Sequence, residues 1–498
     1  MARQNPWLRR GPVAAAALIA VGWLGALGLV CAGDRVTGSP VALQRSQATV
    51  TIDGNLPALP RPPRPPLSEV FRAPVAVQGG YRMSLTANVG GRRVKASWAY
   101  VDGIPGLNGH LDSWLLGVLD TAAAPGGGRY RPAMALNTSP PRVPALTVSA
   151  EPVLTAGTVV VFREETVDTG SDGSRSGSSA TVYADMVSGE VRRGAELLRS
   201  EALDGIRSRV TGVPAGIAGP PSQALALNDV VLDVSGDLHI STEHPAGRGQ
   251  ARQGTTIGAR DADAMLSEVG RRVLGGLRAA PVSPPAVPPA QRHVNCDLVP
   301  CAALSYDDGP DARTTPQLLA ILKEKNVQAT FFMTGSNATA NPAIARQVAD
   351  AGHSIGNHTF SHPYLTKLSP AAVRSEIDRT DAALRAATGS VPALMRPPYG
   401  AADAAVQMAV GKPLILWAVD SLDWQSKNPG VFVPKILKEI TPGAVVLMHD
   451  VDPTTIAGQQ ELITTLQTQG YHLVTVPQMF EGTPLTPGHV YRSRPERK

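Results

Sequence analysis

Strand-like and helix-like segments alternate through the C-terminal part of this 498-residue chain. Short apolar runs predict strands at residues 302–306, 329–333, 354–356, 393–395, 414–417, 444–448 and 472–476. Helical periodicity predicts helices at residues 315–325, 342–351, 370–387 and 456–469. Repeated strand–helix units favour a mostly parallel sheet or a (β/α) barrel, in which catalytic groups gather where the strands end.

Five polar motifs follow predicted strands. In one-letter code they are SYDDGP (305–310), HTFSH (358–362), RPPYG (396–400), DSLDW (420–424) and LMHD (447–450). Each motif alone also fits an ordinary structural role, such as a turn, a surface ion pair or a capped strand end. Their common position at strand ends favours a single site over five unrelated turns.

The two histidines of the second motif have the spacing of a metal-binding pair. His358 and His362 would lie on one face of the chain if the segment were helical. With an aspartate from the first motif they form an Asp/His/His set, which leaves coordination positions open for water and substrate. For the pair alone, two loop histidines without a metal are the alternative.

The remaining motifs carry groups suited to acid–base chemistry. Arg396 could orient a carboxylate through paired hydrogen bonds, with a surface ion pair as the alternative. Leu447 and His449 are two residues apart on a predicted strand and therefore point to the same side. An apolar side chain beside a histidine suits an acyl group next to a proton donor.

In order and spacing, the five motifs resemble those of the polysaccharide deacetylase family, the NodB-homology or carbohydrate esterase family 4 group. The resemblance covers residues 295–480 and departs from the family at Ser305-Tyr306, where Thr-Phe is commoner. It implies an α/β fold, a distorted (β/α) barrel, that hydrolyses N-acetyl groups of a polysaccharide with the help of a metal.

The resemblance also implies the metal site and the general base. Asp308, His358 and His362 would bind a divalent metal, with zinc expected first and cobalt, nickel or manganese as alternatives. Asp307 would be the general base that activates water.

The other motif residues take supporting roles by the same resemblance. His449 would be the general acid, and Asp423 would orient it. Arg396 would hold the general base, and the backbone N–H of Tyr399 would stabilise the oxyanion. Two apolar side chains would wall the acetyl pocket, Trp424 and Leu447.

The N-terminus has the pattern of an exported protein. Three arginines, at positions 3, 9 and 10, precede an uncharged apolar stretch at residues 13–32, whose 20 residues are about the length of one membrane span. We expect residues 1–33 to be an uncleaved membrane anchor, with a cleaved signal as the alternative. The bulk of the chain would then be extracytoplasmic, either membrane-anchored or secreted to the cell wall.

Composition divides the rest of the chain. Proline-dense residues 34–75 predict an extended stalk, and residues 279–294 predict a second linker. Residues 76–278 lie between them and carry no chemical motif. We expect an α+β accessory domain there, with strands at 145–148, 158–162, 181–186 and 230–234 and helices at 192–207 and 261–277. Residues 481–498 are expected to form a C-terminal tail.

A second, weak resemblance concerns the accessory region. Around the sequence YADMVSGE (183–190), residues 140–278 resemble an RsiV-type extracellular domain. This implies an envelope-facing domain without known catalytic residues.

The cysteine spacing and the net charge bear on the disulfide pairing and on the class of partner. Cys296 and Cys301 form a C-x4-C pair, for which a disulfide is expected in an exported chain, with two free thiols or a zinc knuckle as alternatives. The net charge of +5 is spread without a dense basic run, so we expect no nucleic-acid partner.

These features together favour deacetylation of N-acetylglucosamine in peptidoglycan. N-acetylmuramic acid, chitin oligomers and acetylated xylan are alternative substrates. A non-enzymatic glycan-binding or sensor protein is the further alternative, against which Asp307 and His449 argue.

Overall fold

The computed structural model describes residues 75–136, 145–170, 172–211, 229–241, 254–285, 287–288 and 291–497. All of them belong to one compact unit, Arg64–Lys498. The predicted anchor (1–33) and nearly all of the predicted stalk (34–75) lie outside the described residues. Among the helices that are described, none has the length and apolarity needed to cross a membrane.

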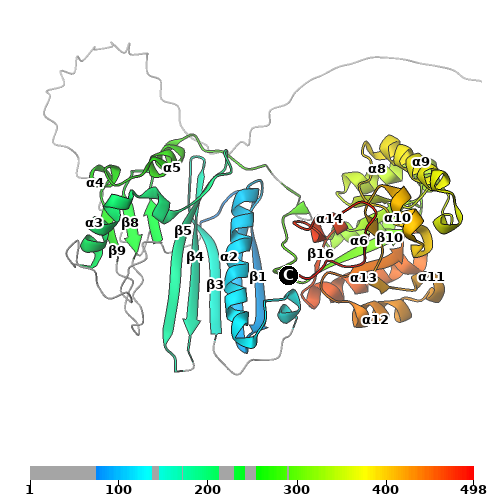
Figure 1. Ribbon diagram of the computed structural model, residues 1–498, viewed down its shortest axis with the longest axis horizontal. Helices are drawn as coiled ribbons and strands as arrows, with labels where there is room; N and C mark the ends of the chain where they lie inside the picture. The colour runs from blue at the N-terminus through cyan, green and yellow to red at the C-terminus, as the bar shows by residue number, and fades with distance from the viewer. Residues whose placement is uncertain are drawn as a thin grey trace, which may run out of the picture. The chain divides into compact units, whose positions relative to one another are not determined.

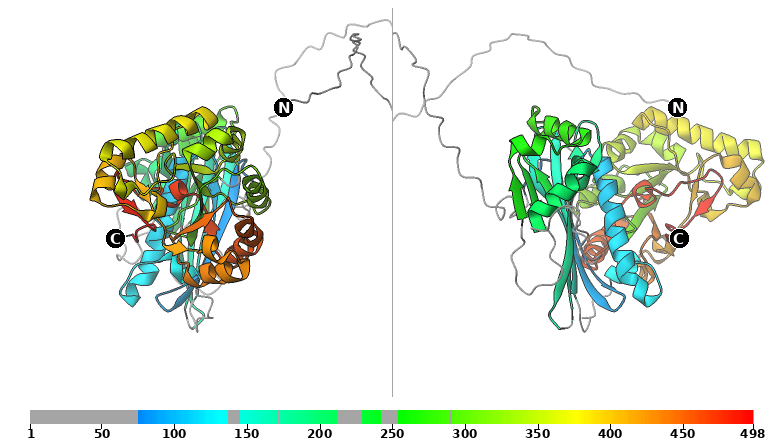
Figure 2. Two further views of the ribbon diagram at one scale, coloured as in Figure 1. Left: turned by 90° about the vertical axis from the view of Figure 1, so that its right-hand side faces the viewer. Right: turned by 60° about the vertical axis from the view of Figure 1, so that its left-hand side comes forward.

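Between residues 75 and 280, the described residues form an α+β arrangement, as expected from the alternating patterns. Its largest element is a six-stranded sheet in chain order, β1 to β6, in which every neighbouring pair is antiparallel except β2 and β3. The strands are β1 (Gly80–Val89), β2 (Arg92–Val101), β3 (Ala145–Ala156), β4 (Val159–Thr169), β5 (Arg175–Asp185) and β6 (Val191–Arg193). Helix α2 (Pro105–Ala123) packs along this sheet, as Figure 2 shows in cyan.

A smaller antiparallel sheet completes this region. It consists of β7 (Asp229–Leu232), β8 (Leu238–Ser241) and β9 (Gly254–Ile257) and packs with α3 (Ser200–Thr211), α4 (Ala259–Asp263) and α5 (Glu268–Arg278). The predicted helix at 192–207 is wrong in its first half, which forms β6 and a 3₁₀ turn. Gly194 begins the 3₁₀ turn, and its backbone lies so close to Thr181 and Val230 that a side chain would not fit there. The predicted helix at 261–277 is interrupted, since Ser267 caps the start of α5.

The C-terminal region is the predicted distorted (β/α) barrel. Its parallel strands follow the order β12-β11-β10-β15-β14, with β16 beside the start of β10. They are β10 (Cys301–Asp307), β11 (Thr330–Met333), β12 (Ser354–Asn357), β14 (Val419–Asp420), β15 (Val445–His449) and β16 (His472–Leu473). Helices surround these strands in Figure 1: α6 (Thr314–Glu324), α7 (Gly335–Ala340), α8 (Pro342–Asp350), α9 (Pro370–Thr388), α10 (Ala404–Val410), α12 (Pro429–Glu439), α13 (Pro453–Thr468) and α14 (Val476–Met479).

The C-terminal segment closes this barrel. The predicted strand at 393–395 is reduced to Met395, which bridges β12 and β13 (Leu414–Ile415). Next to β13 lies β17 (Val490–Tyr491), and Ser493 then pairs with Ala444, the residue before β15. The predicted C-terminal tail is therefore not a separate segment, because its described residues, 481–497, include partners of the barrel strands. They cover the strand edges that the short β13 would leave open.

Strand β10 shows how the core positions the site. All seven of its residues are buried, so the run is apolar like other central parallel strands. Two polar residues, Ser305 and Asp307, are exceptions that need hydrogen-bond partners in the interior. Apolar neighbours such as Leu304, Tyr306 and Phe331 belong to one buried cluster that extends to the surrounding helices.

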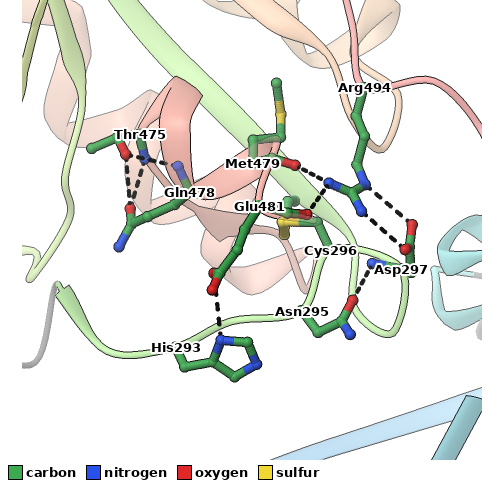
Figure 3. Close-up of a disulfide and its surroundings, with 10 residues drawn as sticks. His293, Asn295, Cys296, Asp297, Thr475, Gln478, Met479, Glu481 and Arg494 are labelled. Carbon is green, nitrogen blue, oxygen red and sulfur yellow. Dashed lines mark hydrogen bonds and ion pairs between the residues drawn. A yellow bond between two sulfur atoms is a disulfide. The ribbon is translucent and has the colours of Figure 1, made fainter. Parts of the chain in front are cut away.

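Cys296 and Cys301 form the expected disulfide, which rules out free thiols and a zinc knuckle. The short loop that it closes precedes β10. Within this loop Asp297 accepts two hydrogen bonds from Arg494, and Arg494 also donates to the backbone carbonyls of Met479 and Glu481 (Figure 3). The start of β10 is thus tied to the segment that closes the barrel.

Candidate active site

The five motifs meet at one edge of the barrel. Parallel strands present their carboxyl ends on the same side, and the register places Asp307 of β10 directly beside His449 of β15. The neighbouring register aligns Met333 of β11 with Asn357, the last residue of β12 before the HTFSH motif. The predicted convergence of the polar motifs at strand ends is confirmed.

The three predicted metal ligands face one another. The Oδ1 atom of Asp308 lies 3.5 Å from Nε2 of His358 and 3.3 Å from Nε2 of His362. One ligand atom from each residue falls within 4.8 Å of the other two, and within the described residues no other group of three such side chains does so. Two imidazoles and one carboxylate are a donor set that suits a divalent transition metal.

The histidine segment is a loop, so the premise of a helix at 358–362 is wrong. The chain turns through left-handed conformations at Thr359 and His362, whose φ angles are 65° and 59°. Glu376 of α9 stabilises the turn, since its carboxylate accepts the backbone N–H groups of Phe360 and Ser361. Nothing in the sequence pattern pointed to Glu376, which lies fourteen residues beyond the motif.

The hydrogen bonds of the two imidazoles leave one nitrogen of each for a metal. The Nδ1 of His358 lies 2.7 Å from the backbone oxygen of Arg396, an acceptor, so Nδ1 carries the proton and Nε2 keeps its lone pair. Burial lowers the pKa of His358 to about 3, which keeps the ring in the neutral form that binds metals. The Nδ1 of His362 faces the hydroxyl of Tyr399 at 3.1 Å.

Asp307, the predicted base, is almost fully buried beside this triad. Arg396 donates from Nη1 to its Oδ1 at 2.7 Å, while His358 Nε2 lies 3.7 Å from Oδ2. Burial raises the pKa of the Asp307 carboxyl above its ordinary value, and the Arg396 charge opposes that rise. A carboxylate whose pKa is raised toward neutrality is a better proton acceptor.

Arg396 is fully buried, and its guanidinium is held on every side. It donates to Asp307, to Ser305 Oγ at 2.9 Å and to the backbone oxygens of Ile415 and Leu416. The predicted role of Arg396 as the partner of Asp307 matches this geometry. The role of Ser305 as a partner of Arg396 was not predicted, although a serine inside an apolar strand was a signal for it.

His449 and Asp423 form a second acid–base pair. Asp423 is fully buried and accepts both the backbone N–H and the Nδ1 of His449, at 2.8 and 2.9 Å. Ser421 and Thr455 also donate to Asp423, and neither was predicted. Although burial opposes a charged ring, the bond to Asp423 raises the pKa of His449 to about 9. A protonated histidine at neutral pH is suited to donate a proton.

The predicted apolar residues take different positions. Leu447 is buried in β15, aligned with Ser305 and Asp420, whereas Trp424 is 53% exposed on the short helix α11 (Asp423–Ser426). Tyr399 is 54% exposed, and its backbone has a left-handed φ of 60°. These residues lie on motifs at the same barrel edge, while the shape of an acyl pocket between them stays a prediction.

Asp423→Asn tests how His449 is held in its protonated form. We expect the alkaline limb of the pH–rate profile to move from about pH 9 toward 6.5, because an amide cannot stabilise the imidazolium. At pH 8 the rate should fall about 10-fold or more, and at pH 6 much less. Asp420→Asn, which removes a nearby charge without touching His449, serves as the control. An unshifted alkaline limb in Asp423→Asn would contradict the assignment.

Comparison with known proteins shows what this chain is similar to. A family model described as polysaccharide deacetylase matches residues 295–412. A peptidoglycan-N-acetylglucosamine deacetylase of Listeria monocytogenes is 39% identical over 216 residues, which cover 43% of this chain and 44% of the relative. A protein of the same description from Bacillus cereus is 37% identical over 186 residues, 36% of this chain and 68% of that relative.

A third relative carries a different sugar in its name. It is a peptidoglycan-N-acetylmuramic acid deacetylase of Bacillus subtilis, 36% identical over 179 residues, which cover 36% of this chain and 38% of the relative. The chain spans less than half of the length of the Listeria relative that it matches.

Proposed function

The chain belongs to the polysaccharide deacetylase family, and from this premise we propose that its barrel removes the N-acetyl group of N-acetylglucosamine in a cell-wall polymer, peptidoglycan first. One observation carries the proposal. A buried, arginine-held carboxylate and a histidine bonded to a buried aspartate flank an Asp/His/His triad at the same barrel edge. That set provides a base, an acid and a metal site, which together are sufficient to hydrolyse an amide at neutral pH.

Asp308, His358 and His362 would hold the divalent metal, and zinc is the first choice for this donor set. When bound, such a metal supplies Lewis-acid polarisation of a carbonyl oxygen and lowers the pKa of water. Cobalt, nickel and manganese remain alternatives, because imidazole and carboxylate ligands accept several of these ions.

The chain's own residues supply the proton transfers. Asp307 takes a proton from the attacking water while the water oxygen bonds to the acetyl carbon. The backbone N–H of Tyr399 stabilises the oxyanion that forms. His449 then gives a proton to the departing nitrogen as the carbon–nitrogen bond breaks, so that acetate and a free amine leave. Asp423 keeps His449 charged for this step.

The N-acetylmuramic acid of the same polymer is the second candidate substrate, favoured by the printed description of the Bacillus subtilis relative. With chitin oligomers or acetylated xylan as the substrate, the same residues would hydrolyse acetyl groups on a different polysaccharide. A purely glycan-binding or sensor role is the remaining alternative, and the hydrogen-bonded Asp307 and His449 speak against it, since binding alone needs neither.

Location and domain roles complete the proposal. Residues 1–33 would anchor the chain, or direct its secretion, and residues 34–75 would lift it from the membrane. A deacetylase of wall polymers has to reach its substrate outside the cytoplasm. The RsiV-type assignment of residues 140–278 and the boundaries of the accessory domain stay predictions.

Mass spectrometry of digested peptidoglycan, after incubation with the full chain, tests the function. We expect loss of one acetyl group, exchanged for hydrogen, on N-acetylglucosamine, with zinc present and not after chelation. The same loss on N-acetylmuramic acid would name the second substrate instead. Parallel assays with chitin oligomers and acetylated xylan cover the other polymers. If none of the four releases amine or acetate, the enzymatic proposal fails.

A further inference from the structure

Two half-exposed tyrosines stand beside the triad without an assigned side-chain role. Tyr364 follows the HTFSH motif and is 45% exposed, while Tyr399 belongs to RPPYG. Their rings are stacked, with centroids 3.8 Å apart and planes inclined by 12°. Exposed aromatic side chains next to a glycan-processing site first suggest a platform on which a sugar ring stacks.

The faces of Tyr364 argue against a sugar platform. Tyr399 covers one face, and the ammonium group of Lys367 lies over the ring at 4.7 Å from its centroid, which takes the other face. A sugar would have to displace one of these partners before it could stack. The neighbour Leu365 is fully buried and anchors the segment that carries Tyr364. Both faces of the Tyr364 ring are therefore occupied, and the buried Leu365 holds its backbone in place.

The side chain of Tyr399 connects this stack to a metal ligand. Its hydroxyl lies 3.1 Å from Nδ1 of His362, and its ring meets the His362 ring edge-on at 4.7 Å between centroids. Both residues have left-handed backbones, with φ of 60° at Tyr399 and 59° at His362. Residues other than glycine adopt this conformation only where surrounding contacts hold them. The contact between the two side chains joins both strained positions.

We propose that Tyr364 is a positioning residue that, by stacking on Tyr399, holds the Tyr399 hydroxyl against His362 and the Tyr399 backbone N–H toward the reacting carbonyl. The inference rests on the proposed function, because it assigns His362 to the metal and the Tyr399 N–H to the oxyanion. Hydrogen-bond partners of metal-binding histidines fix ring orientation, and their loss typically lowers metal affinity about 10-fold to 100-fold.

Three variants of the full chain test this role: Tyr364→Ala, Tyr364→Phe and the control Met408→Ala, which removes an exposed apolar side chain that belongs to none of the five motifs. Zinc affinity is measured by competition with a chelator, and kcat and KM on the polymer that the wild type deacetylates. We expect Tyr364→Ala to weaken zinc binding about 10-fold and to lower kcat about 10-fold with KM unchanged. Tyr364→Phe keeps the ring and should restore both values.

Different failures have different signatures. An increase of KM alone in Tyr364→Ala would overturn the proposal in favour of a glycan-binding platform. Unchanged zinc affinity and kcat would overturn it outright, and a Tyr364→Phe variant as weak as Tyr364→Ala would place the role on the hydroxyl instead of the stack. If the wild type deacetylates no polymer, the proposed function fails, while the zinc measurement still decides whether Tyr364 supports His362.

A double variant tests whether Tyr364 affects zinc affinity through Tyr399. Tyr399→Phe removes the hydroxyl that meets His362, and if Tyr364 acts through it, Tyr364→Ala adds little further loss of zinc affinity in that background. Fully additive losses would contradict a path through Tyr399. Unchanged thermal midpoints in all variants show that the barrel is intact.

Discussion

Replacing Asp307 with asparagine is expected to lower kcat about 10³-fold, a loss within the range that a general base contributes. The variant keeps the shape of the side chain and an oxygen that can accept the hydrogen bond from Arg396. It loses the basic carboxylate that would take the proton from water. Zinc affinity should change little, because Asp307 is not one of the three side chains that converge as the metal triad. Steady-state kinetics and chelator competition measure the two quantities.

The adjacent residue provides the matched control. Asp308→Asn removes the carboxylate that faces both imidazoles at 3.3 and 3.5 Å, so zinc affinity and rate should fall together. The two neighbouring substitutions should therefore be distinguishable. Asp307→Asn lowers the rate alone, whereas Asp308→Asn lowers both the rate and the zinc affinity. Full activity of Asp307→Asn would sink the assignment of the base, and equal zinc loss in both variants would show that the two roles are not separated.

Arg396→Met is expected to reduce the free energy of unfolding by about 3–5 kcal/mol, the usual cost of removing one partner from a buried ion pair. The guanidinium is completely buried, and its loss leaves Asp307, Ser305 and two backbone oxygens without their donor. The pKa of Asp307 should rise further, since Arg396 opposes the effect of burial. Urea unfolding followed by fluorescence measures the change; Trp417, whose ring lies 5.7 Å from the guanidinium, reports on this part of the barrel.

Two comparisons separate the charge from the packing. Arg379→Met removes a guanidinium that also lies over a phenylalanine ring but is half exposed, and it should cost less than about 1 kcal/mol. In Arg396→Met with Asp307→Asn, the buried carboxylate is no longer unpaired, so about 1 kcal/mol or more should be recovered relative to additivity. If Arg396→Met were no more destabilising than Arg379→Met, the buried pair would not be the structural centre of the site.

Sequence patterns located the strands of the barrel well because central parallel strands are continuous apolar runs. The run at 302–306 became β10, and those at 329–333, 354–356 and 444–448 became β11, β12 and β15. The pattern did not predict strands that are very short or whose pairing partners lie far away in the sequence. Met395 makes a single bridge, and β17 has two residues whose partner lies 76 positions earlier. Such contacts leave no local periodicity to read.

The site was predictable to the extent that its residues sit in short motifs. Asp307, Asp308, Arg396, Asp423 and His449 carry their own chemistry and follow strands, so both composition and position pointed to them. Ser305, Glu376 and Thr455 complete the site through hydrogen bonds to these residues or to their loops. Serine, glutamate and threonine are common on protein surfaces, and only the fold shows that these three are turned inward.

Within the barrel, the sequence alone predicted the alternation of the main strands and helices, the strand ends at which polar groups gather, and the kind of chemistry that those groups can perform. These properties depend on residue type and on spacing along a few turns or strands, which are local. Only the tertiary structure decided that the 358–362 segment is a left-handed turn, that the C-terminal residues close the barrel, and that Tyr364 stacks on Tyr399 beside His362. Each of these depends on a contact between segments far apart in the chain or on a backbone shape that packing imposes, and neither leaves a period in the sequence.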